Sequence, residues 1–256
     1  MKVKPMIPEK IFAFSIIWIL AAVAVFFSLM LLPAPYGRHV RNGWGPFLPD
    51  RWGWLLMESP AATGMLIIFL ARLDRQNSVT LFFLILWQAH YFHRAFIYPF
   101  HIKKSRKQMP LSIAFFAFTF NIINVSLNGW MIFSMLSYPP QWFWDIRFIG
   151  GVLLFGSGFV INRHSDHILR RLKHAQNNGY SVPSGGLFNL VSCPNYLGEI
   201  IEWTGWALAT WSWAGLSFAL WTIANLSPRA HSHHHWYHTE FQDYPENRKA
   251  LLPWIW

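Results

Sequence analysis

The chain has 256 residues, of which 54% are hydrophobic and only 12% are charged, so its composition excludes an ordinary soluble domain, whose surface needs more charge. The formal net charge of +10 could serve nucleic-acid binding, but basic loops that face anionic lipid account for it better in a membrane protein. The single cysteine, Cys193, excludes an internal disulfide bond and a cysteine-rich metal site.

Several apolar runs approach the roughly 20 residues that cross a bilayer. They lie at residues 11–32, 54–73, 78–99, 111–136, 144–165, 198–212 and 213–228. The first run lacks a small-residue cleavage site after a short apolar core, so it predicts a membrane anchor and not a signal peptide. The sequence therefore predicts an all-α fold, a polytopic integral membrane protein with seven transmembrane helices, in which no repeat or long linker separates domains.

Lys and Arg are distributed unevenly over the segments between these runs. Most of them lie after the first, third, fifth and seventh runs. Because cytoplasmic loops carry the excess of basic residues, we expect the N-terminus outside the cytosol and the segment after residue 228 inside it. The membrane would be a bacterial inner membrane, or the endoplasmic reticulum if the source is eukaryotic.

Polar side chains interrupt the second and third runs. Glu58 lies early in the second run, in "LLMESPAA", and Tyr91, Arg94 and Tyr98 of "HYFHRAFIY" share one helix face at spacings of 3 and 4. The carboxylate can be an ordinary helix-end residue, and an arginine near the end of a span can extend to the interface. One carboxylate and one tyrosine facing a common cavity would instead form a proton-donating pair.

The fifth run ends in the polar stretch "INRHSDHILRRLKH". Asn162, Asp166, Arg170 and Lys173 are spaced by 4, 4 and 3 residues and so share a helix face. This stripe is either a solvated helix end or one wall of a binding site. The "GSG" at 156–158 lies within the apolar run and not after a strand, so it predicts a helix-packing site and no dinucleotide fingerprint.

A second polar stripe opens the sixth run, "NYLGEIIEWTGWALATW". Asn195, Glu199 and Glu202 fall on one side of a helix. Carboxylates at membrane depth are costly and usually functional, although hydrogen bonding between helices is an alternative. Both stripes begin near the cytosolic face, so together they predict a polar cavity that opens to the cytosol and holds a polar ligand.

Histidines gather in "RAHSHHHWYH" after the last run. His231, His234 and His235 form an H-x-x-H-H pattern, as in the histidine boxes of membrane di-iron oxygenases. The other candidates, "HYFH" and "HSDH", have one histidine pair each and lack the doubled ending. We therefore expect no metal site here, but a histidine-rich turn that contacts phosphate or stacks on a ring.

The sequence is identified by its motifs as resembling the steroid 5α-reductase family. "NYLGEIIEWTGWALATWS" and "RAHSHHHWYHTEFQDYPENRKALLPWIW" carry the resemblance, and "HYFHRAFIY" and "HSDHILRRL" also match. The resemblance is strong over 140–256, good around 54–100 and weak in the first run, and we expect a microbial member. It implies one seven-helix reductase domain over 1–256 that uses NADPH, bound by the half at about 140–256.

The same resemblance assigns residues to the site. Those around NADPH are Asn162, Asp166, Arg170, Lys173, Tyr180, Asn195, Glu199, Arg229, His233 and Tyr237. Those at the substrate are the catalytic pair Glu58 and Tyr91, which meets the substrate carbonyl, and Met57, Arg94 and Tyr98.

Three departures from the family pattern affect specificity. Lys173 and Ser181 stand where the steroid enzymes usually carry arginine, which leaves the choice between NADPH and NADH open. Met57 replaces a usual glutamine, which removes one polar contact and leaves the exact steroid open.

The resemblance implies a hydride added to C5 of a 3-oxo-Δ4-steroid, giving the 5α-3-oxosteroid. Tyr91 would donate to the carbonyl oxygen, where charge develops, and Glu58 would orient it. Asn195 and Glu199 would bind the nicotinamide carboxamide, which has both a donor and an acceptor. Glu202, about 60° further round the helix, would brace its neighbours.

The expected partners are a small hydrophobic substrate that enters from the bilayer and membrane lipids, with no nucleic acid and a monomeric protein. Three alternatives remain at this point. The substrate could be a polyprenal or an enoyl-CoA thioester. The enzyme could be an isoprenylcysteine-type methyltransferase that uses S-adenosylmethionine, although methyl transfer has no need of the Glu58–Tyr91 pair. The chain could also be a non-enzymatic sterol- or lipid-binding membrane protein.

Overall fold

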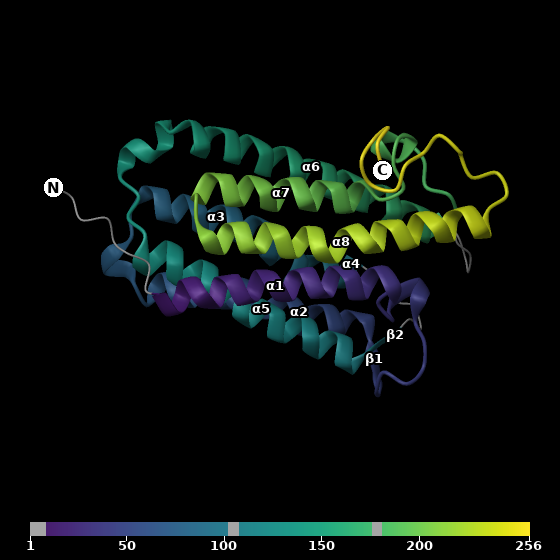
Figure 1. Ribbon diagram of the computed structural model, residues 1–256, viewed down its shortest axis with the longest axis horizontal. Coiled ribbons are helices and arrows are strands. Elements are labelled where there is room, and N and C mark those ends of the chain that lie inside the picture. The colour runs from purple at the N-terminus through teal and green to yellow at the C-terminus, as the bar shows by residue number, and fades with distance from the viewer. Residues whose placement is uncertain (1–8, 102–107, 176–180) are drawn as a thin grey trace. The chain divides into compact units, whose positions relative to one another are not determined.

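The computed structural model describes residues 9–101, 108–175 and 181–256. Its helices are α1 (Glu9–Leu31), α2 (Asp50–Leu70), α3 (Ser78–Phe92), α4 (Tyr98–His101), α5 (Leu111–Trp130), α6 (Ile146–Ala175), α7 (Pro194–Thr210) and α8 (Trp213–Glu240) (Figure 1). Short 3-10 or π segments are η1 (Gly37–His39), η2 (Leu73–Arg75), η3 (His93–Ile97), η4 (Met131–Met135), η5 (Pro140–Trp144) and η6 (Gly186–Asn189). The predicted all-α class is confirmed, apart from one antiparallel pair of short strands, β1 (Phe47–Pro49) and β2 (Gln108–Pro110).

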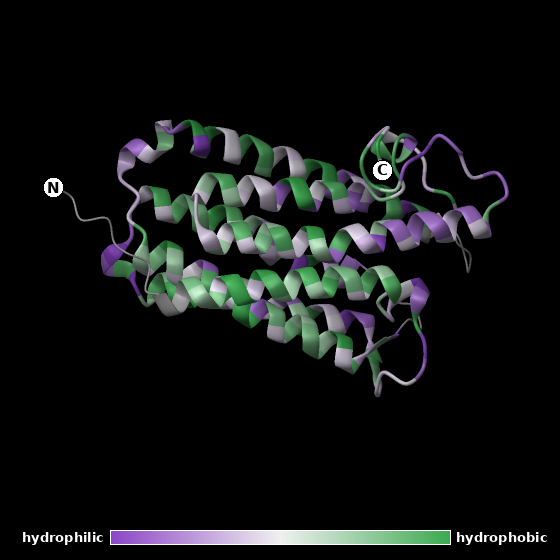
Figure 2. Ribbon diagram, viewed as in Figure 1, coloured by the Kyte–Doolittle hydropathy of each residue, from purple (hydrophilic) through white to green (hydrophobic). Residues whose placement is uncertain are grey.

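Helices long and apolar enough to cross a membrane occur at four of the predicted places. They are Phe12–Leu31, Asp50–Leu70, Leu111–Met135 and Ile146–Leu172. The other three predicted runs are also helical, but within the described residues α3, α7 and α8 do not combine that length with that hydropathy. The chain is thus a multi-pass membrane protein, and the seven-span topology stays a prediction. In Figure 2, α1 is almost wholly hydrophobic, whereas hydrophilic residues gather toward the end of α8.

Local chemistry explains where several helices begin. Asn77 caps α3, because its side chain accepts hydrogen bonds from the amides of Val79 and Thr80 and the Thr80 hydroxyl accepts from the amide of Asn77. Asp50 lies in the first turn of α2, where a negative charge opposes the positive end of the helix dipole. Pro194 is the first residue of α7, a position where the missing amide hydrogen costs nothing.

The helix that contains the predicted run 213–228 is longer than that run. Helix α8 continues through Pro228 to Glu240. The histidine-rich segment is therefore the last part of a helix and not a turn. Packing explains the continuation, because Tyr237 is only 4% exposed and its ring stacks on Tyr244, at 5.2 Å between centroids and an interplanar angle of 6°.

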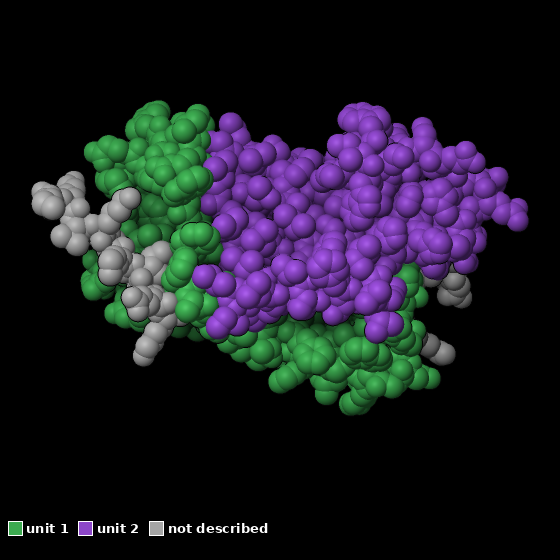
Figure 3. Space-filling model, viewed as in Figure 1, with its two compact units in different colours: residues 1–15, 34–149, 210–214 green, residues 16–33, 150–209, 215–256 purple. Residues whose placement is uncertain are grey.

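The described residues divide into two compact units, coloured separately in Figure 3. Of the described residues, unit 1 comprises 9–15, 34–101, 108–149 and 210–214, and unit 2 comprises 16–33, 150–175, 181–209 and 215–256. The expectation of one domain over 1–256 stays a prediction.

Unit 1 packs α2 against α3 and α5. The indole of Trp87 on α3 is fully buried and donates to the carbonyl of Ala61, at 2.8 Å. Pro60 interrupts the hydrogen-bond ladder of α2 because it has no amide hydrogen for the carbonyl of Leu56. The hydroxyl of Ser59 lies 3.5 Å from that carbonyl and partly replaces the missing donor. The helix continues through Pro60, and the residues on either side of Glu58–Pro60, namely Met57 and Ala61, are buried.

Unit 2 joins α6 to α7 through glycines that alternate between the two helices. A Cβ added at Gly158 would lie 2.7 Å from the Cα of Glu202, and one added at Gly198 would lie 2.5 Å from the amide nitrogen of Asn162. Gly151 and Gly205 are as closely covered by the facing backbone. The prediction that "GSG" is a helix-packing site is confirmed at Gly158.

The segment after α8 is tied back to the start of α7. Val191 and Lys249 form a parallel bridge, and the amide of Ser192 donates to the carbonyl of Lys249 at 2.7 Å. Leu251, 3% exposed, joins a buried apolar cluster with Cys193 and Ala230. This segment is thus an integral part of unit 2.

Candidate functional site: two buried polar clusters

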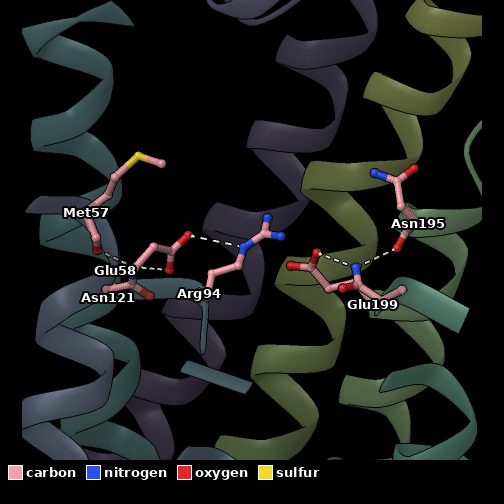
Figure 4. Close-up of polar contacts among 7 residues, drawn as sticks. Met57, Glu58, Arg94, Asn121, Asn195 and Glu199 are labelled. Atoms are coloured by element: carbon pink, nitrogen blue, oxygen red, sulfur yellow. Dashed lines mark hydrogen bonds and ion pairs between the residues drawn. The ribbon is translucent and has the colours of Figure 1, made fainter. Parts of the chain in front are cut away.

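The first cluster surrounds Glu58 in unit 1. Its Oε1 lies 3.7 Å from Nε of Arg94, and the two side chains are 14% and 17% exposed (Figure 4). Because an isolated buried charge is very costly and a paired one is far less so, each charge makes the burial of the other tolerable.

Asn121 of α5 completes this cluster from the opposite side. Its Nδ2 donates to the main-chain carbonyl of Met57 at 2.6 Å and lies 3.3 Å from Oε2 of Glu58 (Figure 4). We did not single out Asn121 from the sequence. The signal was present, because Asn121, Asn124 and Asn128 form a polar stripe at spacings of 3 and 4 within an apolar run.

Arg94 is held by aromatic rings as well as by Glu58. Its guanidinium carbon lies 4.8 Å from the ring centroid of Trp54 and 5.6 Å from that of Tyr98. The rings of Trp54 and Tyr98 meet edge to face, with 5.2 Å between centroids. Such stacking favours a fixed cation. Arg94 is therefore held within unit 1 by side chains of α2 and α4, and whether it also extends to the membrane interface stays a prediction.

The other two substrate-side residues are also buried in unit 1. Met57 is 7% exposed and packs with Met109 and Ala114 in an apolar cluster. Tyr91 is 4% exposed, with its ring centroid 4.8 Å from that of Trp87. The pairing of Tyr91 with Glu58 stays a prediction.

The second cluster lies at the contact of α6 and α7 in unit 2. Asn162, 4% exposed, donates from Nδ2 to the main-chain carbonyl of Asn195 at 3.0 Å. The same nitrogen lies 3.5 Å from Oε2 of Glu199. Gly198 makes this approach possible, because any side chain there would meet the backbone at Asn162. The two predicted polar stripes thus meet, and the cavity expected beside them stays a prediction.

Other predicted cofactor residues lie on α6 and α8. On α6, Asp166 is 7% exposed and Arg170 is half-buried. The side chain of Lys173 and the whole of Tyr180 lie outside the described residues. On α8, Arg229 is half-buried, and Nε2 of His233 lies 3.2 Å from the hydroxyl of Tyr196.

Glu202, whose role the sequence left open, is fully buried at the same helix contact. Its backbone packs on Gly158. This position fits the expected bracing role, which stays a prediction.

The histidine cluster fastens the segment after α8. Nδ1 of His234 lies 2.6 Å from the hydroxyl of Ser192, which in turn lies 2.6 Å from the hydroxyl of Tyr244. Burial, followed by the positive charges of neighbouring histidines and Lys249, lowers the pKa of His234 to about 4. His234 is therefore neutral near pH 7 and can accept a hydrogen bond. Among the described residues, no group of three or more His, Cys, Asp or Glu is placed to hold a metal ion.

Unit 1 also has an open apolar hollow of about 410 Å³ on its surface. It is lined by Gly45, Pro46, Leu56, Leu111, Ser112, Phe115 and Phe118. None of these is a predicted site residue, so the hollow does not define the site.

Comparison with known proteins gives consistent matches. A family model described as 3-oxo-5-alpha-steroid 4-dehydrogenase matches residues 107–256. The chain is 43% identical over 236 residues to steroid 5-alpha-reductase DET2 of Arabidopsis thaliana, covering 89% of this chain and 90% of that protein. It is 36% identical over 239 residues to 3-oxo-5-alpha-steroid 4-dehydrogenase 1 of Bos taurus, covering 91% and 92%.

A third relative, 3-oxo-5-alpha-steroid 4-dehydrogenase 2 of Rattus norvegicus, is 41% identical over 228 residues, covering 87% of this chain and 88% of that protein. These relatives come from a plant and two mammals, so they lend no support to the expected microbial source.

Proposed function

Because the chain belongs to the 3-oxo-5-alpha-steroid 4-dehydrogenase family, we propose that it is an oxidoreductase that reduces the Δ4 double bond of a 3-oxo-Δ4-steroid. The product is the 5α-3-oxosteroid, and the cofactor is NADPH. The observation that carries this proposal is identity of 36–43% over about nine-tenths of the chain to named steroid 5α-reductases. The buried Glu58 cluster supports it, because reduction of an enone needs polar groups at one end of an apolar substrate.

The electronic demand of the reaction assigns roles to unit 1. When hydride reaches C5, negative charge develops on the C3 oxygen, and a donor at that oxygen lowers the barrier. The Tyr91 hydroxyl is the proposed donor, and the Glu58 carboxylate is proposed to orient it. Tyr91 is 4% exposed and the Glu58 side chain 14%, and this low exposure strengthens each polar contact. C4 then takes a proton, for which water is a sufficient source.

The chemistry of the donors and acceptors in unit 2 fits a nicotinamide. When bound, NADPH supplies the hydride. The carboxamide of its ring needs one acceptor and one donor, which the carboxylate of Glu199 and the amide of Asn195 offer. Asn162 uses the main-chain oxygen of Asn195, and so it fixes the first turn of α7 without engaging that side-chain amide.

Cations on the helices of unit 2 fit the phosphates. Arg170 lies on α6 and Arg229 on α8, and both are half-buried. Guanidinium groups suit phosphate because they offer paired donors and a permanent charge. We propose these two residues, with Asp166, Lys173, Tyr180, His233 and Tyr237, as the remaining cofactor contacts.

The proposed topology has seven spans, with the N-terminus outside and the segment after α8 in the cytosol. The basic residues after the odd-numbered runs support this orientation. A steroid would enter from the bilayer, in which it dissolves, and the protein would act as a monomer.

A substrate panel tests the proposal. Purified protein in detergent is incubated with NADPH and, separately, with progesterone, testosterone, a polyprenal and an enoyl-CoA. We expect loss of NADPH absorbance only with the two steroids, with one 5α-reduced steroid formed per NADPH oxidised. Reduction of only the polyprenal or only the enoyl-CoA thioester would show that the substrate belongs to that class and is not a steroid. Methyl transfer from S-adenosylmethionine without NADPH oxidation would show that the protein is a methyltransferase and not a reductase.

A further inference from the structure

We propose that Asn121 is a positioning residue that holds Glu58 as a charged hydrogen-bond acceptor. Glu58 would then orient a donor and would not itself donate to the substrate carbonyl. This inference rests on the proposed function for its catalytic meaning. The contact that it describes is a property of unit 1 alone and can be tested without turnover.

The orientation of the Asn121 amide follows from its shorter hydrogen bond. The Met57 carbonyl, at 2.6 Å, can only accept, so the atom that faces it must be the amide nitrogen. That nitrogen carries a second hydrogen, and Oε2 of Glu58 lies 3.3 Å away. Oε2 must therefore accept a hydrogen bond, which a protonated oxygen facing the same group would do poorly.

The second carboxylate oxygen also faces a donor. Oε1 lies 3.7 Å from Nε of Arg94, and a guanidinium is always charged and never an acceptor. Each oxygen of Glu58 thus has its own donor, from α5 on one side and from η3 on the other. This arrangement suits an ionised carboxylate and gives a neutral acid no acceptor among these two partners.

Asn121 also fixes the backbone that carries Glu58. Its bond to the carbonyl of Met57 ties α5 to the residue immediately before the carboxylate. One buried amide therefore restrains both the helix backbone and the side-chain oxygen. Displacement of a catalytic group by about 1 Å can cost about 100-fold in rate, so this restraint matters for turnover more than for binding.

A neighbouring asparagine of the same stripe supplies a matched control. Asn124 is 1% exposed, and its Oδ1 accepts from Nδ2 of Asn128 at 3.1 Å. Asn128 also lies 3.4 Å from the carbonyl of Ala214. Asn124 therefore matches Asn121 in residue type, helix, face and burial, but its hydrogen-bond partner is another amide and not the carboxylate.

The first test compares steady-state kinetics of Asn121→Ala and Asn124→Ala with progesterone. We expect Asn121→Ala to lower kcat by about 10- to 100-fold, with less than about a threefold change in KM and in the Kd of NADPH. Asn124→Ala should stay within about threefold of the parent kcat. Equal kcat losses in the two variants, or no loss in either, would overturn the proposal. If Asn121→Ala does not fold, Asn121→Leu replaces it, because it keeps roughly the shape, removes both amide hydrogens and adds no charge beside Glu58.

The second test needs no turnover. Apparent Tm is measured in detergent for the parent, Asn121→Ala, Glu58→Ala and the double variant. If the contact is real, the double variant should lose clearly less Tm than the sum of the two single losses. Additive losses would overturn the proposal. A parent protein inactive on every 3-oxo-Δ4-steroid would refute the proposed function, and the Tm cycle would still decide whether Asn121 holds Glu58.

Discussion

Units 1 and 2 each bury a polar cluster between helices, but they build it with different parts. In unit 1, long side chains reach the carboxylate of Glu58, namely the guanidinium of Arg94 and the amide of Asn121. In unit 2, glycines bring two backbones together, and Asn162 reaches mainly a main-chain carbonyl. The carboxylate of Glu58 in unit 1 is therefore held by individual side-chain groups. The polar cluster in unit 2 is held by the close spacing of α6 and α7.

This difference predicts different consequences of substitution. Removing one functional group in unit 1 should change the rate and leave the helices in place. Changing the spacing in unit 2 should weaken the protein and its cofactor binding together.

The largest expected effect belongs to unit 1. Tyr91→Phe removes one hydroxyl and keeps the ring that packs on Trp87. If this hydroxyl donates to the developing oxyanion, kcat should fall by about two to four powers of ten, while NADPH affinity stays unchanged. Stopped assays with mass detection of reduced steroid measure the rate, and NADPH fluorescence titration measures the affinity. Near-full turnover in Tyr91→Phe would reduce the residue to a packing role.

Next in size is the cofactor contact of unit 2. Glu199→Ala should weaken NADPH binding by about 10- to 100-fold, since a hydrogen bond to a charged group contributes about 1.5–3 kcal/mol. Asn195→Ala should weaken it by about 2- to 10-fold, since a neutral hydrogen bond contributes about 0.5–1.5 kcal/mol. Their apparent Tm without cofactor should change little. The measurement is again a fluorescence titration in detergent. Unchanged NADPH affinity in both variants would show that Asn195 and Glu199 do not contact the cofactor.

A smaller effect should follow from the glycine contact. Gly198→Ala places a Cβ 2.5 Å from the amide nitrogen of Asn162, so the helices must separate, at a cost of about 1–3 kcal/mol. We expect a lower apparent Tm and weaker NADPH binding in the same variant. Gly156→Ala is the control, because its Cβ meets nothing within 4 Å and alanine favours the helix. If the two variants melt at the same temperature, close approach is not what holds α6 to α7.

The smallest expected effect is the pH dependence of the hydrogen bond between His234 and Ser192. Burial lowers the pKa of His234 from 6.5 to about 4. As the pH falls, His234 is therefore protonated near pH 6.5 in the unfolded chain but only near pH 4 in the folded chain. Stability should therefore fall as pH falls through this window and be fully retained above it. Apparent Tm between pH 7 and pH 4 should decline less steeply in His234→Asn, which keeps an acceptor for Ser192 and does not titrate. Parallel curves for the two proteins would contradict this.

Much of the helical framework could be predicted from the sequence, because apolar runs and polar stripes reflect local periodicity. The stripe at Asn162 and the stripe at Asn195 were predicted to share a site, and the structure joins them by a hydrogen bond. The extension of α8 through Pro228 could not be predicted, because the burial of Tyr237 and its stacking on Tyr244 depend on how the segment after the helix folds back. From the local sequence alone, a proline such as Pro228 predicts the end of a helix.

The neighbours of Glu58 were only partly predictable. Asn121 lay in a recognisable polar stripe, but only the contact of α5 with α2 shows that it meets a carboxylate. Arg94 had two interpretations from sequence, and only the structure shows that it lies on the π segment η3 and contacts Trp54. Partners that come from different helices depend on tertiary packing, which periodicity along one helix does not encode.

The most direct test of the proposed reaction follows the hydride itself. The purified protein is given progesterone and NADPH deuterated at the transferring position of the nicotinamide, and the product is analysed by NMR and mass spectrometry. We predict one deuterium at C5 on the α face, an unlabelled hydrogen from water at C4 and an intact C3 ketone. Deuterium at C3, with a C3 alcohol as the product, would contradict the account, and so would a reduced steroid without label at C5.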